Sequence, residues 1–493
     1  MTPSNRLRTS LHSFVAVLVF NVTVTPVIAT EKTQPNILWI MLDDGRADAL
    51  GSYGQAWAKT PHFDSLAADG VRFRYAIVQS PVCTPSRTSM KTALYAHETG
   101  VMAMGKPPEI TPAFAQFVRQ RPPVLLDTWT TAGRRPVNFG KMHAFRDRFE
   151  HAGDIPQFFN NQGKPRPPIE GKLGPKKHPI IQTRLYNWMI GGLVDVKPED
   201  MRTSVLGDRA VETVHRLANE NRPFFLRVSF HAPHVPCHIN PEHLIDPESI
   251  DLPLPTDLEL AGKPRYEEQI RTYAGADLNL KQIRLARATY YSMISLVDDQ
   301  VGRILAALRQ HNLLENTIIA VNSDQGFQLG EHGAWKKRDF YDTNVLVPLI
   351  FRYPKQLPQG KVIDEPVELV DFLPTLLDLS GLDPPNKIRG RSLLPLIRGE
   401  VTQWREACFS EHDHTQDVYR CLRENGGRRV MVRTKEWKLI FFMDERKTDK
   451  DGALYDLKND PWEKTNLWTS PRHQPIVQRL ERMAHEWDRN TRS

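Results

Sequence analysis

The chain of 493 residues has a hydrophobic content of 40% and a formal net charge of +7. It is long enough to bury a large core, and its composition excludes a disordered or fibrous protein. Its basic segments, such as residues 164–166, are interleaved with Pro and Gly rather than aromatic residues, which favours an acidic substrate and disfavours nucleic acid. The four cysteines are too few for a disulfide-built scaffold and form no C-x-x-C zinc pair, although Cys408 and Cys421 could pair after export.

The N-terminus has the pattern of a secretory signal peptide over residues 1–29. Arg6 and Arg8 precede an apolar run from Phe14 to Val24, and the small residue Ala29 marks the expected cleavage site. The run is too short to span a bilayer comfortably, and no later stretch of the sequence is long and apolar enough. We expect a soluble exported protein, periplasmic or secreted, without stable membrane insertion; the alternative is an uncleaved anchor.

Three apolar runs are typical of strands buried on both faces of a sheet, and each leads directly into polar residues. Residues 36–42 lead into Asp43 and Asp44, residues 224–230 into the histidines of residues 231–238, and residues 317–322 into Ser323 to Gly326. Ligands bind at the carboxyl ends of such strands. The fold class expected is therefore α/β: a large, mainly parallel sheet flanked by helices.

Apolar periodicity predicts helices over residues 60–70, 124–131, 205–219, 281–311 and 367–379, and a strand over residues 345–352. Tyr290 and Tyr291, in the fourth of these helices, are expected in the core rather than in a site. Residues 145–205 are rich in Pro, Gly and basic residues, which predicts a long insertion that shapes a substrate pocket.

The sequence changes in character near residues 395–405, which separates a catalytic domain, residues 30–400, from a small C-terminal α+β subdomain, residues 401–493. Residues 429–434 and 437–443 predict a small antiparallel sheet, and an apolar stripe that ends near Trp487 predicts a final helix. The polar run Glu411, His412, Asp413, His414 is interpreted as a solvated loop or a loop at the substrate rim rather than as a second metal site.

The segment over residues 81–100 predicts a helix with a cysteine at its mouth. Thr84 is expected as the N-cap and Pro85 as the first helical residue, and Arg87 lies four residues beyond Cys83. The positive end of a helix stabilises anions and activates sulfur or oxygen nucleophiles.

The remaining candidates fall into oxygen donors and cations. Four residues offer oxygen only, which suits Ca²⁺ or Mg²⁺ rather than zinc or copper: Asp43, Asp44, Asp324 and Gln325. Five residues offer positive charge: Arg87, Lys141, His143, His234 and Lys337. Cationic side chains beside a metal imply that the site holds an anionic group. Transfer of a phosphoryl or sulfuryl group needs its charge held, an in-line nucleophile and a proton for the leaving group.

These residues together resemble the sulfatases of the alkaline phosphatase superfamily over nearly all of the chain after residue 29. The resemblance is carried by Cys83-Thr-Pro-Ser-Arg87, Gly140-Lys-Met-His143, His231-Ala-Pro-His234, Ser323-Asp-Gln-Gly326 with Lys337, and Leu454 to Pro461. Residues 323–349 and 367–371 look most like iduronate-2-sulfatases and related bacterial polysaccharide sulfatases.

The resemblance implies that a maturation enzyme oxidises Cys83 to formylglycine, whose hydrated aldehyde attacks sulfur. It also implies that Asp43, Asp44, Asp324, Gln325 and the modified Cys83 hold one Ca²⁺. In the same way, Arg87 and Lys141 would steady the formylglycine, and His143 would assist deprotonation of its hydroxyl. His234 and Lys337 would bind the sulfate, and one of them would protonate the leaving oxygen.

The chain departs from the usual family pattern at two positions, and at two others the assignment chooses between neighbouring residues of the same type. Many family members have Asn or His where this chain has Gln325, and the family usually has Gly at the position of Ala93. His234 is preferred over His231 because its place before Val-Pro matches the family turn. Lys337 is preferred over Lys336 by its spacing from Gly333.

The expected function is calcium-dependent hydrolysis of sulfate esters on a sulfated carbohydrate. One alternative is a phosphonate or phosphate-ester hydrolase that uses the same formylglycine. The second is an unmatured, catalytically silent carbohydrate-binding protein.

Overall fold

The computed structural model describes residues 34–54, 56–104, 125–134, 136–142, 150–151, 179–220, 222–251, 253–417, 419–423, 426–443 and 452–492. Residues 35–493 make up one compact unit. The predicted signal peptide lies outside the described residues, as does much of the insertion predicted over residues 145–205. No helix in the described ranges combines the length and the apolar character needed to cross a membrane.

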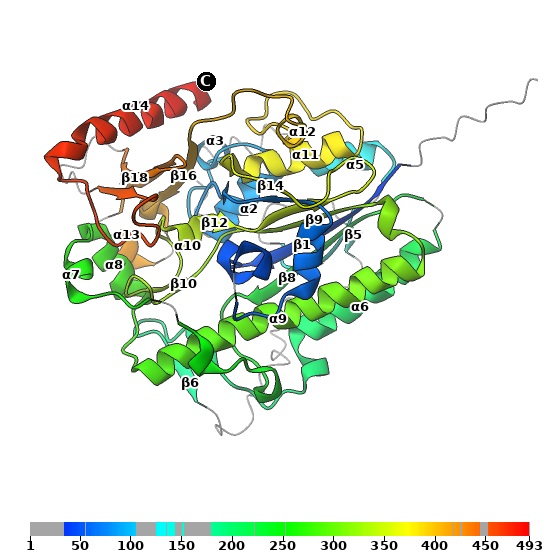
Figure 1. The fold of residues 1–493 in the computed structure, drawn as a ribbon, viewed down its shortest axis with the longest axis horizontal. Coiled ribbons are helices and arrows are strands. Elements are labelled where there is room, and N and C mark those ends of the chain that lie inside the picture. The colour runs from blue at the N-terminus through cyan, green and yellow to red at the C-terminus, as the bar shows by residue number, and fades with distance from the viewer. Residues whose placement is uncertain are drawn as a thin grey trace, which may run out of the picture. The chain divides into compact units, whose positions relative to one another are not determined.

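The centre of the unit is an eight-stranded sheet with the order β14-β2-β13-β9-β1-β8-β4-β5 (Figure 1). The strands are β14 (Lys361–Ile363), β2 (Val71–Phe73), β13 (Leu349–Arg352), β9 (Thr317–Ser323), β1 (Asn36–Asp43), β8 (Phe225–Pro233), β4 (Pro136–Gly140) and β5 (Glu150–His151). Only β13 runs against its neighbours among these described strands. The prediction of a large, mainly parallel sheet is confirmed.

Strand β1 is central because its residues are apolar on both faces. It pairs in parallel with β8 on one side and with β9 on the other. Leu38, Ile40 and Leu42 pack into one buried cluster, whereas Ile37, Trp39 and Met41 pack into a second cluster on the opposite face. A strand covered on both sides shows a continuous apolar run, as the sequence has here.

Helices cover both faces of the sheet (Figure 1). Helix α9 (Leu280–Gln310) packs with α6 (Arg202–Ala218) and α1 (Pro61–Ala68) in the first cluster. Helices α2 (Cys83–Thr92), α5 (Leu125–Thr131) and α11 (Phe372–Leu379) pack in the second. Tyr290 and Tyr291 of α9 are buried in the core.

One predicted helix begins later in the structure than in the prediction. Val367–Glu368 form strand β15, and a 3-10 turn precedes α11. The Glu368 main-chain N–H donates to the Asp371 carboxylate at 3.1 Å, as part of a capping box that begins the 3-10 turn. The strand predicted over residues 345–352 is divided into β12 (Leu346–Val347) and β13.

A smaller antiparallel sheet, β16-β17-β18-β19, lies near the C-terminus and packs against a final helix. Its strands are β16 (Cys408–Asp413), β17 (Arg428–Arg433), β18 (Trp437–Phe442) and β19 (Ala453–Asp456), and the helix is α14 (Gln474–Thr491). The predicted small sheet with a helix is confirmed. The interpretation of residues 411–414 as a solvated or rim loop is wrong, because Glu411 and His412 are buried in β16.

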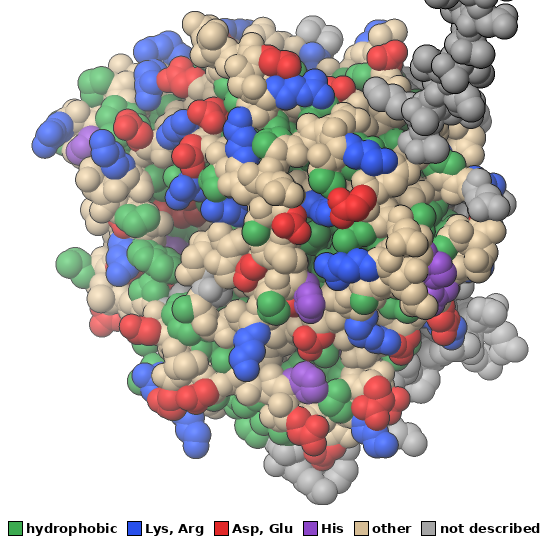
Figure 2. All heavy atoms as spheres, turned by 45° about the vertical axis from the view of Figure 1, so that its right-hand side comes forward, with side chains coloured by type: hydrophobic (Ala, Val, Ile, Leu, Met, Phe, Trp, Pro, Cys, Tyr) green, Lys and Arg blue, Asp and Glu red, His purple; other side chains and the backbone are tan. Residues whose placement is uncertain are grey.

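Surface charge is mixed on the face drawn in Figure 2, where acidic and basic side chains are interspersed. The basic excess of the sequence is therefore not gathered into one patch on that face.

Candidate active site

Four adjacent strands end at one edge of the central sheet. Strands β9, β1, β8 and β4 are consecutive and parallel, so their carboxyl ends lie together. The candidates carried at or just after these ends are Asp43, Asp44, Lys141, His231, His234, Asp324 and Gln325. Carboxylate oxygens of Asp43, Asp44 and Asp324 lie within 4.8 Å of one another. Sheet topology thus assembles a site from segments that are far apart in the sequence.

Helix α2 brings Cys83 to this edge. The helix begins at Cys83 itself, with the extended residue Val82 as its N-cap, so the prediction of Thr84 as N-cap is wrong. Cys83 is fully buried, and its Sγ lies 3.9 Å from Met104 Sδ. One turn along, the Ser86 hydroxyl donates to the main-chain oxygen of Asp324 at 2.5 Å, which fastens the helix to the end of β9.

Arg87 connects α2 to residues on or just after four strands. Its Nε donates to Asp324 Oδ2 at 2.6 Å, and its Nη1 donates to the Lys141 carbonyl and to Ser229 Oγ, both at 3.1 Å. Its Nη2 lies 3.8 Å from Asp43 Oδ1. Burial alone would lower the pKa of Arg87, but the two carboxylates outweigh burial and raise it. Ser229 was not predicted as a site residue, although it is a rare polar residue in an apolar run.

The acidic cluster has buried oxygens that accept no hydrogen bond. They are Asp43 Oδ1, Asp44 Oδ2 and Gln325 Oε1. Burial raises the pKa of Asp324 to about 7, although Arg87 opposes this. Buried oxygens without donors are costly unless a cation or water satisfies them, and oxygen-only sets of this kind suit hard divalent cations. The residues present therefore fit a Ca²⁺-type ion.

Two lysines neutralise the acidic cluster in part. Lys141 forms an ion pair with Asp43, and Lys337 donates to Asp44 Oδ1. Burial would raise the pKa of Asp43, but Lys141 and other nearby cations hold it well below its usual value. Lys336 points elsewhere: its Nζ lies 3.5 Å from the centre of the Trp188 ring. The two adjacent lysines therefore have different surroundings, and of the two it is Lys337 that hydrogen-bonds a cluster carboxylate.

Both candidate histidines lie at this edge. The Nε2 of His234 is 3.9 Å from Asp44 Oδ2, and its Nδ1 donates to the Val235 carbonyl at 2.6 Å. His231 also brings a ring nitrogen within 4.8 Å of ligand atoms of Asp43 and His234. Burial, followed by Lys141, lowers the pKa of His234 well below its usual value. His143, the third predicted histidine, lies outside the described residues.

Gly140 is required by the approach of β4 to β8 beside the site. Its φ is +85°, and a Cβ at this position would lie 2.0 Å from the Ser229 carbonyl oxygen. The glycine lets the chain turn there and places Lys141 against Asp43.

Comparison with known proteins agrees with the motifs. A sequence model of the family described as Sulfatase matches residues 35–382, and a model described as N-sulphoglucosamine sulphohydrolase, C-terminal, matches residues 330–490. An arylsulfatase of Clostridium perfringens is 28% identical over 479 residues, which cover 91% of this chain and 93% of the relative. An N-acetylglucosamine-6-O-sulfatase of Bacteroides thetaiotaomicron is 26% identical, with 93% and 88% covered.

Solved structures share the fold. A phosphonate monoester hydrolase of Agrobacterium radiobacter superposes with a TM-score of 0.78 at 24% identity, covering 93% of this chain and 96% of that one. A 2-O GAG sulfatase superposes with a TM-score of 0.72 at 25% identity, covering 93% of each chain. With a family match over residues 35–382, the chain belongs to the sulfatase family of sulfuric ester hydrolases, within the alkaline phosphatase superfamily.

Proposed function

We propose that this protein is an exported, calcium-dependent sulfatase that removes sulfate esters from a sulfated carbohydrate and uses a formylglycine made from Cys83. The observation that carries the proposal is the set of three buried, unsatisfied oxygens surrounded by lysine, arginine and histidine side chains at the start of α2. Such a site has places for a hard cation and for an anion next to it.

The metal would be held by Asp43, Asp44, Asp324 and Gln325, together with the modified residue 83. When bound, Ca²⁺ supplies positive charge that stabilises the sulfuryl oxygens as charge develops on them. The formylglycine, once its aldehyde is hydrated, would supply the attacking hydroxyl oxygen. In the chain itself, Ser86 and Arg87 fix the helix that carries residue 83.

Lys141, Lys337 and His234 surround the position where the sulfate would lie. Their nitrogens reach the carboxylates Asp43 and Asp44, so an anion above these carboxylates is within reach of the same side chains. We assign them to sulfate binding and to orientation of residue 83. His234 or Lys337 would give a proton to the leaving oxygen.

The proposed substrate class is supported by the relatives. They are named arylsulfatase and N-acetylglucosamine-6-O-sulfatase, and both match over most of their length. A sulfated sugar is therefore the substrate class we propose.

The decisive measurement combines mass spectrometry with paired substrates. Protein coexpressed with a formylglycine-generating enzyme is digested with trypsin, and the peptide Tyr75–Arg87 is analysed for conversion of Cys83 to the aldehyde. Activity is then compared on matched sulfate, phosphate and phosphonate esters, with Cys83→Ala as the inactive control. Preference for phosphonate or phosphate esters would replace the sulfatase proposal, and sugar binding without turnover of any ester by the converted protein would identify a silent binding protein.

A further inference from the structure

Lys337, which donates to Asp44 in the candidate site, lies between two residues with an unusual backbone conformation. Lys336 has a φ of +83° and Arg338 has a φ of +105°, in a region that residues other than glycine rarely adopt. Such conformations persist only where the surrounding structure holds them, and they are common at functional sites. The contacts that fix Lys336 and Arg338 therefore also fix the direction in which the Lys337 side chain points.

One tyrosine contacts both neighbours of Lys337. Tyr273 lies at the end of α8 (Arg265–Ala274) and is fully buried. Its hydroxyl oxygen accepts from Lys336 Nζ and from Arg338 Nη1, each at 3.3 Å, as its two lone pairs allow. Burial, followed by Arg338, lowers the pKa of Lys336 well below its usual value, but an amine donates a hydrogen bond as an ammonium does. The Tyr273 oxygen thus joins the residues on either side of Lys337.

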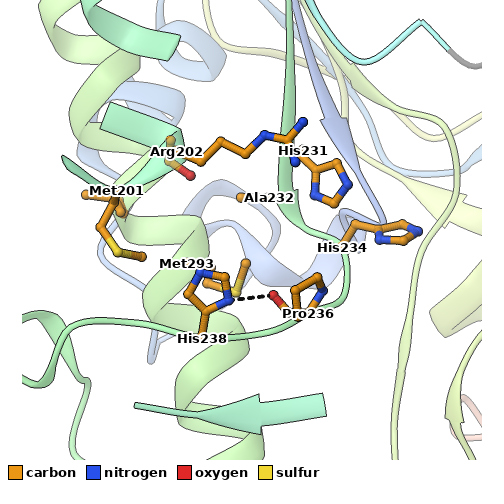
Figure 3. A pocket seen from close by; sticks show the side chains of 10 residues that line it. Met201, Arg202, His231, Ala232, His234, Pro236, His238 and Met293 are labelled. Carbon is orange, nitrogen blue, oxygen red and sulfur yellow. Dashed lines mark hydrogen bonds between the residues drawn. The ribbon is translucent and has the colours of Figure 1, made fainter. Parts of the chain in front are cut away.

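Lys336 has a second contact, on the side of the turn after β8. Its Nζ lies 3.5 Å from the centre of the Trp188 ring, and Trp188 directly precedes β7 (Met189–Gly192). The Met189 carbonyl accepts from the main-chain N–H of Cys237 at 2.9 Å. Cys237 belongs to the turn that carries His234 (Figure 3). Lys336 is therefore held beside the same turn that positions His234.

Arg338 is held from the C-terminal subdomain. Its Nε and Nη2 donate to the two carboxylate oxygens of Asp417, at 2.8 and 3.3 Å, and its guanidinium lies 4.8 Å from the centre of the Tyr419 ring. Arg338 and Asp417 are both buried, and a two-point contact of this kind fixes the orientation of the guanidinium. One buried ion pair thus connects the C-terminal subdomain to the segment that carries Lys337.

We propose that the Tyr273 hydroxyl and the Arg338–Asp417 pair are positioning residues, which aim Lys337 at the sulfate by fixing the backbone on both sides of it. The inference rests on the proposed function for the role of Lys337. It adds residues outside the anion site to the reaction, one of them in the C-terminal subdomain. A displacement of a catalytic group by about 1 Å can lower a rate by about 100-fold, so such support affects activity strongly.

The test is a double-mutant cycle between Tyr273→Phe and Lys337→Ala. Tyr273→Phe removes the shared acceptor and keeps the ring. Each variant is coexpressed with a formylglycine-generating enzyme, conversion of Cys83 is measured, and kcat/KM is determined on an aryl sulfate. We expect Tyr273→Phe to lower kcat/KM by roughly 10- to 100-fold where Lys337 is present, and by less than about twofold in the Lys337→Ala background. A merely structural role of the hydroxyl would cause the same loss in both backgrounds.

A second variant and a control complete the cycle. Asp417→Asn keeps the size of the side chain, weakens the other anchor, and should lower kcat/KM by roughly 3- to 10-fold, again only where Lys337 is present. The control is Tyr455→Phe, because the buried Tyr455 hydroxyl also has two partners, Glu267 Oε1 and the Tyr341 hydroxyl, both at 3.4 Å. This variant removes the same group from another part of the core and should leave kcat/KM within about twofold.

Anion binding keeps this result separate from the sulfatase proposal. In a Cys83→Ala background, calorimetric titration with inorganic sulfate should show binding weakened about 5- to 10-fold by Tyr273→Phe where Lys337 is present, and unchanged in the Lys337→Ala background. This binding pattern in a protein that hydrolyses no sulfate ester supports the positioning role and rejects the sulfatase proposal. Hydrolysis that depends on Lys337, with no loss from Tyr273→Phe or with equal losses in both backgrounds, overturns the positioning role alone.

Discussion

Replacement of Arg87 tests whether this side chain holds the active edge together. Arg87→Gln removes the partner of a buried carboxylate and two further hydrogen bonds, to the Lys141 carbonyl and to Ser229. Breaking a buried ion pair from one side costs about 3–5 kcal/mol. Arg87→Lys keeps the charge but cannot form the three hydrogen bonds of the guanidinium. The loss of two of them costs about 1–3 kcal/mol.

The assay is the midpoint of urea unfolding, followed by tryptophan fluorescence, together with kcat/KM on an aryl sulfate. The matched control is Arg74→Gln, because Arg74 is 51% exposed and pairs with the exposed Asp364 at 2.5 Å. An exposed pair contributes about 0–1 kcal/mol. We expect Arg87→Gln to lower the free energy of unfolding most, Arg87→Lys less, and Arg74→Gln least. If Arg87→Gln lowers the free energy of unfolding no more than Arg74→Gln does, the hydrogen bonds of Arg87 do not hold α2 to the strands.

Four other predictions concern stability. Ala93 ends α2 with a φ of +52°, so Ala93→Gly should raise the free energy of unfolding by about 1 kcal/mol in urea, and a decrease would contradict this. Gly140→Ala should lower it by roughly 2–4 kcal/mol and reduce kcat/KM, because the new Cβ meets the Ser229 carbonyl; unchanged unfolding would refute the clash. Burial would raise the pKa of Glu411, but His97 and Arg428 hold it at about 2. The stability that this carboxylate provides should thus be complete above pH ~4.3 and be lost as the pH falls toward 2, and Glu411→Gln should remove this acid-dependent part of the unfolding curve. Ca²⁺ at a hundredfold excess over Kd should raise the free energy of unfolding by about 2.7 kcal/mol and the thermal midpoint with it, and a chelator should reverse the shift; Ca²⁺ without effect would count against the metal site.

Much of the central sheet is predictable from the sequence because buried parallel strands have a local signature. The residues of β1 are apolar on both faces, and the acids Asp43 and Asp44 stand where the run stops. The same pattern recurs in β8 and β9, so the convergence of their ends follows from parallel pairing alone.

Strand direction and partners are not encoded locally in the same way. Strand β13 is an apolar run like the parallel strands of the sheet, although it pairs antiparallel with both β9 and β2. Its direction depends on these two partners and therefore cannot be predicted from its own residues. Strand β16 was missed because Glu411 and His412 are polar, which usually indicates a loop. Glu411 is nevertheless satisfied inside the protein, by the main-chain N–H of His97 at 2.8 Å and by Arg428 at 2.7 Å. A polar strand of this kind is recognisable only once its distant partners are known.

The choice between neighbouring candidates also depends on distant partners. Lys336 and Lys337 are residues of the same type and adjacent in the chain, yet Lys336 contacts an aromatic ring and Lys337 contacts a carboxylate. Lys336 has a φ of +83°, so the chain bends there and the two side chains diverge. Spacing from a motif can favour one of two such lysines, but the bend that separates them is set by the packing around it.

Ligand geometry alone does not identify a metal site, as two groups in the described chain illustrate. His412, His414 and Asp417 bring ligand atoms within 4.8 Å of one another, as the three strand-end aspartates do. Arg338, however, donates to both oxygens of Asp417, at 2.8 and 3.3 Å. Burial, followed by the nearby Arg429, lowers the pKa of His414 well below its usual value. One carboxylate paired with Arg338, with Arg429 acting on the neighbouring His414, leaves positive charge that repels a cation, whereas three carboxylates with unsatisfied oxygens attract one. The charge around each group therefore favours Asp43, Asp44 and Asp324 as the ligands of the ion.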